Sequence, residues 1–178
     1  MKTLLPILYL SILFLFLTIL VFFLTQEIKE KRKLEEKFIS LKKKIQFNSS
    51  SVNTIDHYLL GKAYLSKKLF DQSIIQFSQA LKKWKPEDSI ELAFLYNAIG
   101  FTYFQSNQID MAIQYYREAL SSNPTYTTAL TNLAFCYERK KMIKDAIKIY
   151  KNVLNYDPIN EVAVQKLEYL SKKSKISG

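Results

Sequence analysis

The chain has 178 residues, of which 48% are apolar, and its 26 Lys and Arg against 16 Asp and Glu give a formal net charge of +10. With one Cys, one His and three Gly, the composition excludes an internal disulfide, a Cys/His zinc site and a glycine-rich phosphate loop. Most classes of enzyme are thereby disfavoured, and we predict a non-enzymatic protein without catalytic residues, metal site or cofactor.

An uncharged apolar segment stands at the N-terminus. Between residues 4 and 24, 18 of 21 residues are apolar. As a helix with a rise of about 1.5 Å per residue, this segment would be roughly 30 Å long, which matches the hydrocarbon core of a bilayer. A secretory signal peptide is the alternative, but its apolar part is usually shorter, and no small-residue cleavage site follows Leu24. We therefore predict an uncleaved transmembrane helix over residues 4–24.

Basic residues beside this segment predict its orientation. Lys2 alone precedes it, whereas eight basic residues follow closely: Lys29, Lys31, Arg32, Lys33, Lys37, Lys42, Lys43 and Lys44. Because Lys and Arg next to a span stay on the cytoplasmic side, the C-terminal part is expected in the cytoplasm, or in the stroma of a plastid. The same charges could also bind anionic lipid headgroups, or could be only a topology signal and a solvated helix face.

Residues 27–47 combine charges of alternating sign with apolar residues at helical spacing. Four apolar residues share one helix face: Leu34, Phe38, Leu41 and Ile45. This pattern predicts a basic juxtamembrane helical stalk over residues 27–47, whose apolar face could pack on the rest of the chain or on a partner. The polar run from Asn48 to Ser51 has poor helix propensity, so a linker is expected at residues 48–53.

An internal repeat occupies the chain from Thr54 onward. With a shift of 34 residues, 93–103 aligns with 127–137, and three later residues recur as well: Ala112, Tyr116 and Pro124 align with Ala146, Tyr150 and Pro158. A weaker first copy has matching residues at Gly61, Tyr64, Ser73, Phe77 and Ala80, and five extra residues around 85–92 separate it from the second. Each copy predicts two amphipathic helices ended by a turn, so the repeats are placed at 54–87, 93–126 and 127–160.

The recurring residues have packing reasons. Gly61, Gly100 and Ala134 stand where only a small side chain lets the first helix of a pair cross the second closely. Aromatic residues fill the space beside the crossings: Tyr64, Phe77, Tyr103, Tyr116, Tyr137 and Tyr150. Asn123-Pro124 and Asp157-Pro158 end second helices. The 34-residue period and this order of small, aromatic and proline residues resemble the tetratricopeptide repeat.

The resemblance covers residues 54–172 and implies a solenoid of three helix pairs, with a capping helix at residues 161–172. The pattern departs from the family at Ser73 and Val153, where alanine is usual, and at Lys85, where proline is expected. The predicted fold class is therefore all-α: an N-terminal transmembrane helix and helical stalk, then an α-solenoid of three tetratricopeptide helix pairs and a C-terminal capping helix. Three repeats with a cap are about the minimum for a continuous core.

The resemblance also implies a protein-binding groove lined by the first helix of each repeat. Mapped onto this sequence, the groove residues are Tyr58, Lys62, Phe94, Asn97, Phe101, Phe104, Thr131, Asn132, Phe135 and Glu138. Chaperone-binding members hold a terminal carboxylate with basic residues, but Phe94, Thr128 and Asn132 occupy such positions here. An extended or helical apolar segment is therefore the expected ligand, although aromatic residues at this spacing could equally belong to the core.

Nucleic-acid binding is a second class of function to weigh. Four lysines share a stripe on a predicted second helix: Lys140, Lys144, Lys148 and Lys151. Only three of the 26 basic residues are Arg, whereas phosphate recognition tends to use Arg forks, so the stripe favours an ordinary solvated face.

The layout of the whole chain resembles one group of tetratricopeptide proteins. A single N-terminal span, the juncture LTQEIKEKRKLEEK at residues 24–37 and three repeats are similar to the membrane-anchored photosystem I assembly factors of algal plastids and cyanobacteria. This resemblance implies a single-pass protein of the plastid thylakoid membrane whose repeats face the stroma and bind photosystem I subunits or another assembly factor. A general bacterial inner-membrane scaffold and a tether for RNA or anionic lipid are the alternatives.

Overall fold

The main chain is described by a computed structural model over residues 4–47, 52–84 and 89–176. These residues form eight helices and no strand, which confirms the all-α class. The chain divides into two compact units, Met1–Ser49 and Ser50–Gly178, which are described separately below.

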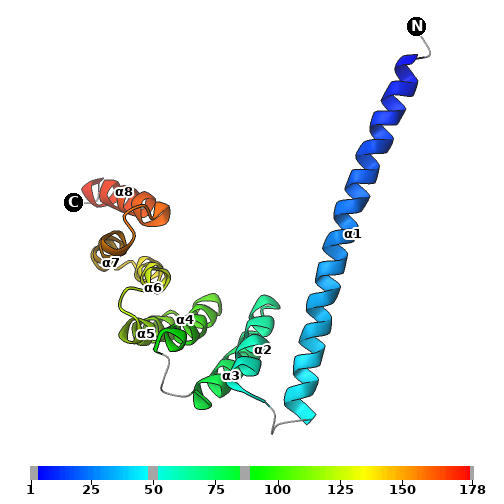
Figure 1. The fold of residues 1–178 in the computed structure, drawn as a ribbon. Coiled ribbons are helices and arrows are strands. Elements are labelled where there is room, and N and C mark those ends of the chain that lie inside the picture. Colours follow the sequence, from blue (N-terminus) through cyan, green and yellow to red (C-terminus); the bar gives the residue numbers. More distant parts are fainter. Residues whose placement is uncertain (1–3, 48–51, 85–88, 177–178) are drawn as a thin grey trace. The chain divides into compact units, whose positions relative to one another are not determined.

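The first unit contains one continuous helix, α1, which runs from Leu4 to Phe47 (Figure 1). With a rise of about 1.5 Å per residue it is roughly 66 Å long. The apolar and the charged segments predicted from the sequence are thus parts of one helix, because no Gly or Pro separates them. Its apolar part is long and hydrophobic enough to cross a membrane, with a mean hydropathy of 2.2 over 18 residues.

Hydroxyl groups in the apolar part of α1 are paired inside the helix. The Thr18 and Thr25 hydroxyls donate to main-chain carbonyls one turn earlier, each at 2.8 Å. Neither hydroxyl therefore needs water, which is the condition for placing a polar group in hydrocarbon.

The second unit begins at a helix cap. Of the predicted linker 48–53, residues 48–51 lie outside the described residues. Asn53 caps α2: its side chain accepts from Asp56 N at 2.8 Å, and the Asp56 carboxylate accepts from Asn53 N at 3.1 Å. This reciprocal pair satisfies two main-chain donors at the helix start and explains why α2 begins at Thr54.

Seven helices follow in pairs with a last single helix (Figure 1): α2 Thr54–Ser66, α3 Phe70–Lys82, α4 Ser89–Gln105, α5 Ile109–Ser122, α6 Thr127–Arg139, α7 Ile143–Tyr156 and α8 Glu161–Ile176. Each helix packs on the next along the chain, and α4 also contacts the first helices of the neighbouring pairs, α2 and α6. This is the arrangement of a helical solenoid, in which each repeat touches only its neighbours.

The extra residues between the first two repeats lengthen a helix. Helix α4 starts at Ser89, four residues before the predicted repeat, and has 17 residues where α2 and α6 have 13. The remainder of this insertion, residues 85–88 with Lys85 and Pro86, lies outside the described residues. Helix α8 also continues to Ile176, beyond the predicted end of the cap at residue 172.

Small residues allow the helices of a pair to cross closely, as the sequence predicted. A Cβ atom on Gly61 would lie 2.6 Å from the Phe77 ring. A Cβ atom on Gly100 would lie 2.9 Å from the Tyr116 ring and 3.3 Å from the carbonyl oxygen of Ala112. Both glycines are therefore required by contact with the second helix and not by an unusual backbone conformation.

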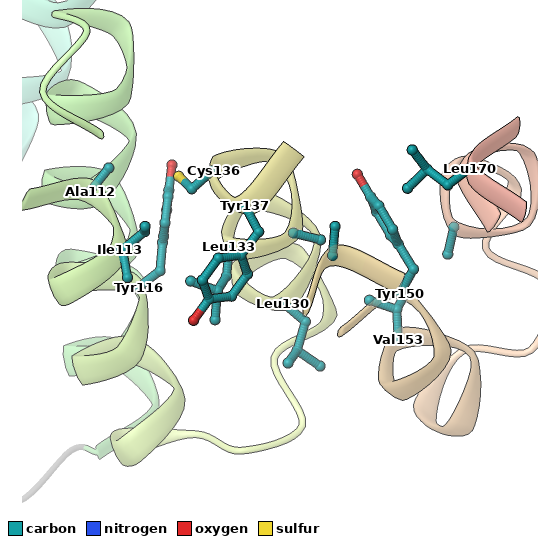
Figure 2. Packing of buried hydrophobic residues seen from close by; sticks show 13 residues of the cluster. Ala112, Ile113, Tyr116, Leu130, Leu133, Cys136, Tyr137, Tyr150, Val153 and Leu170 are labelled. Atoms are coloured by element: carbon teal, nitrogen blue, oxygen red, sulfur yellow. The ribbon is translucent and has the colours of Figure 1, made fainter. Parts of the chain in front are cut away.

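The core of the second unit is divided into two clusters. The larger joins the second and third pairs to α8 and includes Tyr116, Tyr150 and Leu170 (Figure 2). The smaller joins the first and second pairs through Phe77, Leu95 and Ile99. Tyr103 packs against both clusters, so it links them.

Cys136 is fully buried in the larger cluster. Burial raises the pKa of its thiol to about 12, so the group stays protonated at neutral pH and is a poor nucleophile. We expect iodoacetamide to leave Cys136 unmodified in the folded protein and to modify it completely after denaturation, as measured by mass spectrometry. Rapid modification of the native chain would contradict the burial.

Candidate protein-binding site

The ten predicted site residues lie on the first helices of the three pairs, α2, α4 and α6. We call the surface formed by these residues the first-helix face. Side-chain contacts between different helices bring part of the set together, and other members contact only their own repeat or α8.

Two amides on this face are held in fixed orientations. Asn132 Nδ2 donates to Asn97 Oδ1 at 3.0 Å, and Asn97 Nδ2 donates to the Tyr126 hydroxyl at 3.4 Å. Burial raises the pKa of Tyr126, so this hydroxyl remains protonated. The Tyr126 ring meets the Phe94 ring edge-on at 5.1 Å. The hydrogen-bonded side chains of Asn97, Asn132 and Tyr126 therefore form a polar track from α4 to α6, beside the exposed Phe94 ring.

The four phenylalanines of the face differ in exposure. Phe94 and Phe101 are 42% and 36% exposed, whereas Phe104 and Phe135 pack against the larger core cluster. The Arg139 guanidinium lies 5.8 Å from the centre of the Phe104 ring. The aromatic stripe is thus divided, since Phe94 and Phe101 are exposed to solvent whereas Phe104 and Phe135 support the core.

Glu138 ties three helices together. Its carboxylate accepts from the Tyr150 hydroxyl on α7 and from Lys166 Nζ on α8, the latter at 3.0 Å. Lys166 Nζ also lies 5.0 Å from the centre of the Phe135 ring. The Glu138 side chain is only 17% exposed, so this ion pair is screened less than one on the open surface. The Glu138 carboxylate is therefore already paired, and it links α6 to α8.

The remaining predicted residues have local contacts. Lys62 Nζ lies 5.7 Å from the centre of the Tyr58 ring, and that ring packs at 5.8 Å on Phe77 of the same pair. The Thr131 hydroxyl donates to the Thr127 carbonyl at 2.9 Å, one turn earlier in α6. Thr131 thus uses its donor inside the helix, whereas the Lys62 side chain is exposed.

The site predicted from the sequence did not include three residues of this region: Tyr126, Lys166 and Tyr169. The last two were detectable, because the 34-residue shift that relates Phe101 to Phe135 leads next to Tyr169, and the same shift relates Asn132 to Lys166. Tyr169 is 58% exposed. Helix α8 therefore extends the first-helix face in addition to covering the core.

Within residues 4–47, 52–84 and 89–176, no group of three or more His, Cys, Asp and Glu side chains could hold a metal ion.

The class of protein follows from the helix pairs and from two family comparisons. Models of the tetratricopeptide repeat match residues 51–125 and 103–168. The crystal structure of the MamA protein matches with a TM-score of 0.70 at 19% identity, covering 83% of this chain and 76% of that one. The first tetratricopeptide domain of Spaghetti (RPAP3), bound to the HSP90 peptide SRMEEVD, matches with a TM-score of 0.62 at 20% identity, covering 69% and 94%. At these identities the likeness shows the fold.

Sequence relatives give the family. The protein ycf37 of Guillardia theta is 42% identical over 135 residues, which are 76% of this chain and 75% of that one. The ycf37 of Pyropia yezoensis is 37% identical over 73% and 74% of the two chains. The chloroplastic tetratricopeptide protein PYG7 of Arabidopsis thaliana is 28% identical over 70% of this chain and 40% of its own length. The chain therefore belongs to the ycf37 family of tetratricopeptide repeat proteins.

Membership of this class defines the general activity. Tetratricopeptide domains are scaffolds that bind protein partners, including peptides, as in the RPAP3 complex. The first-helix face carries exposed aromatic rings beside oriented amides.

Proposed function

We propose that this protein is a membrane-anchored scaffold of the plastid thylakoid that holds photosystem I subunits, or another assembly factor, on its first-helix face during assembly of the complex. The proposal joins three parts: an anchor, a binding face and a compartment. Each part is supported by a different observation.

The anchor is assigned to the apolar part of α1. Residues 4–24 carry no charge, the threonine hydroxyls are paired within the helix, and a basic segment follows directly. These features suit a single-pass helix whose C-terminal side lies in the stroma, because the flanking Lys and Arg resist transfer across the membrane. The basic residues that would set this topology make up much of the basic charge near the N-terminus.

The binding face is the observation that supports the scaffold role most directly. Phe94 and Phe101 expose apolar rings, and Asn97 and Asn132 present amides whose orientation is set by their mutual hydrogen bond. An apolar peptide segment could bury side chains on the rings while its main chain pairs with the amides. Glu138 is neutralised by Lys166, so the face favours an apolar ligand over a strongly basic one at its α6 end.

The compartment is supported by the relatives. The ycf37 proteins match most of this chain, and PYG7 is chloroplastic by name. The layout of one apolar helix, a basic stalk and three repeats is the layout that resembles photosystem I assembly factors. A photosynthetic complex is therefore the partner to test first.

The test is recovery of partners by the tagged full chain in a photosynthetic host whose own relative has been deleted. We expect photosystem I subunits to be recovered with the wild-type chain and lost, by at least tenfold, with the double variant Phe101→Ser and Phe135→Ser. Each substitution removes a large apolar contact from the face, worth about 1–2 kcal/mol of binding. Quantitative mass spectrometry of the recovered proteins gives the ratio.

A matched control separates binding from folding. Ile75→Ser removes a 55% exposed apolar side chain from α3, outside the first-helix face, and should leave recovery unchanged. Because Phe135 also packs against the core, Phe101→Ser alone serves as the milder test in a chain whose circular dichroism is unaltered. Unchanged recovery of photosystem I subunits with both face variants would argue against the proposal. So would an equal decrease of photosystem I and photosystem II in the host from which the relative has been deleted. Recovery of unrelated membrane proteins or RNA would support one of the alternative roles.

A further inference from the structure

An apolar pocket lies between α2 and α4, at the start of the first-helix face. Its volume is about 320 Å³, and it is lined by side chains from the beginnings of both helices and by Trp84, which follows α3. Leu95 belongs to the smaller core cluster, and Tyr58 and Trp84 pack against that cluster. The walls are thus supported by the core, and the volume is at the lower end of the range for ligand sites, which suits one large side chain.

The rim of the pocket is apolar and open to solvent. Ile55 is 62% exposed and Phe94 is 42% exposed, and both line the pocket. Ile90, one turn before Phe94 on α4, is 58% exposed. Exposed apolar side chains that adjoin a pocket are typical of interaction sites, because a bound partner removes them from water.

One charged group indicates what the pocket would accept. Among the described residues that line it, Glu91 is the one with a charge, and its side chain is exposed.

The pocket is continuous with the polar track of the first-helix face. Phe94 lines the pocket, and its ring contacts Tyr126, whose hydroxyl accepts from the Asn97 amide. A chain that placed a side chain in the pocket would therefore have amide groups within reach of its next residues.

We propose that the pocket binds one bulky apolar side chain of a peptide segment in the partner protein, with a Lys or Arg close by that pairs with Glu91. A fatty acyl chain carries no cation along its length, so the Glu91 carboxylate favours a basic peptide over a lipid tail. This inference rests on the proposed function, because it specifies the segment that the first-helix face would hold.

The test uses the full chain in bilayers of zwitterionic phosphatidylcholine, probed with a random displayed peptide library without tryptophan. We expect the selected peptides to share one Leu, Ile, Met or Phe with a Lys or Arg near it. Trp84 is the only tryptophan of the chain, so its fluorescence reports directly on the pocket. A synthetic copy of a selected peptide should change this fluorescence in a saturable way.

Three variants make the test specific. Glu91→Lys should lower the affinity for the selected peptide about fivefold to tenfold, because an exposed attraction between charges becomes a repulsion. The same variant, used in its own selection, should enrich peptides with an acidic residue beside the apolar one. Ile55→Ser should abolish the Trp84 response to the peptide. Ile75→Ser, which removes an isoleucine of similar exposure on α3 outside the pocket, should leave both the affinity and the response unchanged.

Several results would overturn the proposal: a selection without an apolar anchor, a motif that Glu91→Lys does not alter, or a Trp84 signal that responds to oleate and not to the peptides. The two proposals can fail separately. If Ile55→Ser retains the photosystem I subunits that Phe101→Ser loses, the pocket proposal fails and the proposed function stands. If wild-type chain recovers no such subunits but its pocket still binds basic apolar peptides, the proposed function fails and the pocket stands.

Discussion

Replacement of Tyr150 by alanine is expected to lower the free energy of unfolding of the repeat unit by about 3–5 kcal/mol. The Tyr150 side chain is fully buried and packs in the cluster that contains Val153 of α7 and Leu170 of α8 (Figure 2). Its removal leaves a cavity where three helices meet and also takes away the hydroxyl that donates to Glu138. Urea denaturation of the full chain in detergent, followed by circular dichroism, measures the change.

A pair of conservative variants checks the physical reason. Tyr150→Phe keeps the ring but removes the donor to the Glu138 carboxylate, so it should cost about 2 kcal/mol. Tyr116 occupies the corresponding place in the preceding repeat, and its buried hydroxyl has no partner among the described residues. Tyr116→Phe should therefore be neutral, or should stabilise the unit by up to about 1 kcal/mol. Equal losses in the two variants would contradict this account of the hydroxyl groups.

Replacement of Gly100 by valine is expected to cost about 3 kcal/mol of stability. Even a Cβ atom at this position would lie 2.9 Å from the Tyr116 ring and 3.3 Å from a main-chain oxygen of α5. A branched side chain must therefore push α4 and α5 apart. The same denaturation experiment reports the loss, and circular dichroism before denaturation shows whether the variant still folds.

Smaller changes at equivalent positions provide the controls. Gly100→Ala should cost only about 1 kcal/mol, because alanine's better helix propensity offsets part of the crowding. Ala134 is the equivalent residue of the third repeat and already has a Cβ atom, so Ala134→Gly should cost about 1–2 kcal/mol through lower helix propensity and the loss of a buried methyl group. A Gly100→Val variant with unchanged stability would show that the crossing is looser than described.

Much of the repeat fold could be predicted because its signals are tied to contacts. A small residue, an aromatic residue and a turn recur at fixed offsets, and each offset corresponds to a helix crossing or a helix end. The start of α4 was less predictable, since five extra residues interrupt the period and part of them continue the helix. The apolar and basic N-terminal segments were distinguished by composition, but nothing between them stops a helix, and α1 continues through both.

The binding site was less predictable than the fold. Phe101 and Phe135 stand at the same offset in successive repeats, yet one is open and the other packs on the core beneath Lys166. This difference depends on α8, whose side chains add to the face. Tyr126 lies in a turn before α6, where helical spacing gives no information, although it accepts from Asn97. The pocket beside Trp84 likewise depends on three segments that meet only in the folded chain.

The division of the core into two clusters has a consequence for local opening. The smaller cluster joins the first and second pairs, and the larger one joins the second and third pairs to α8, with Tyr103 as the shared residue. Because each repeat contacts only its neighbours, α2 and α3 can unfold transiently while the larger cluster stays intact. Amide hydrogen exchange would then be faster in α2 and α3 than in α6 and α7. A ligand bound in the pocket between α2 and α4 would slow that exchange. Binding could therefore be measured as slower amide hydrogen exchange in the first repeat.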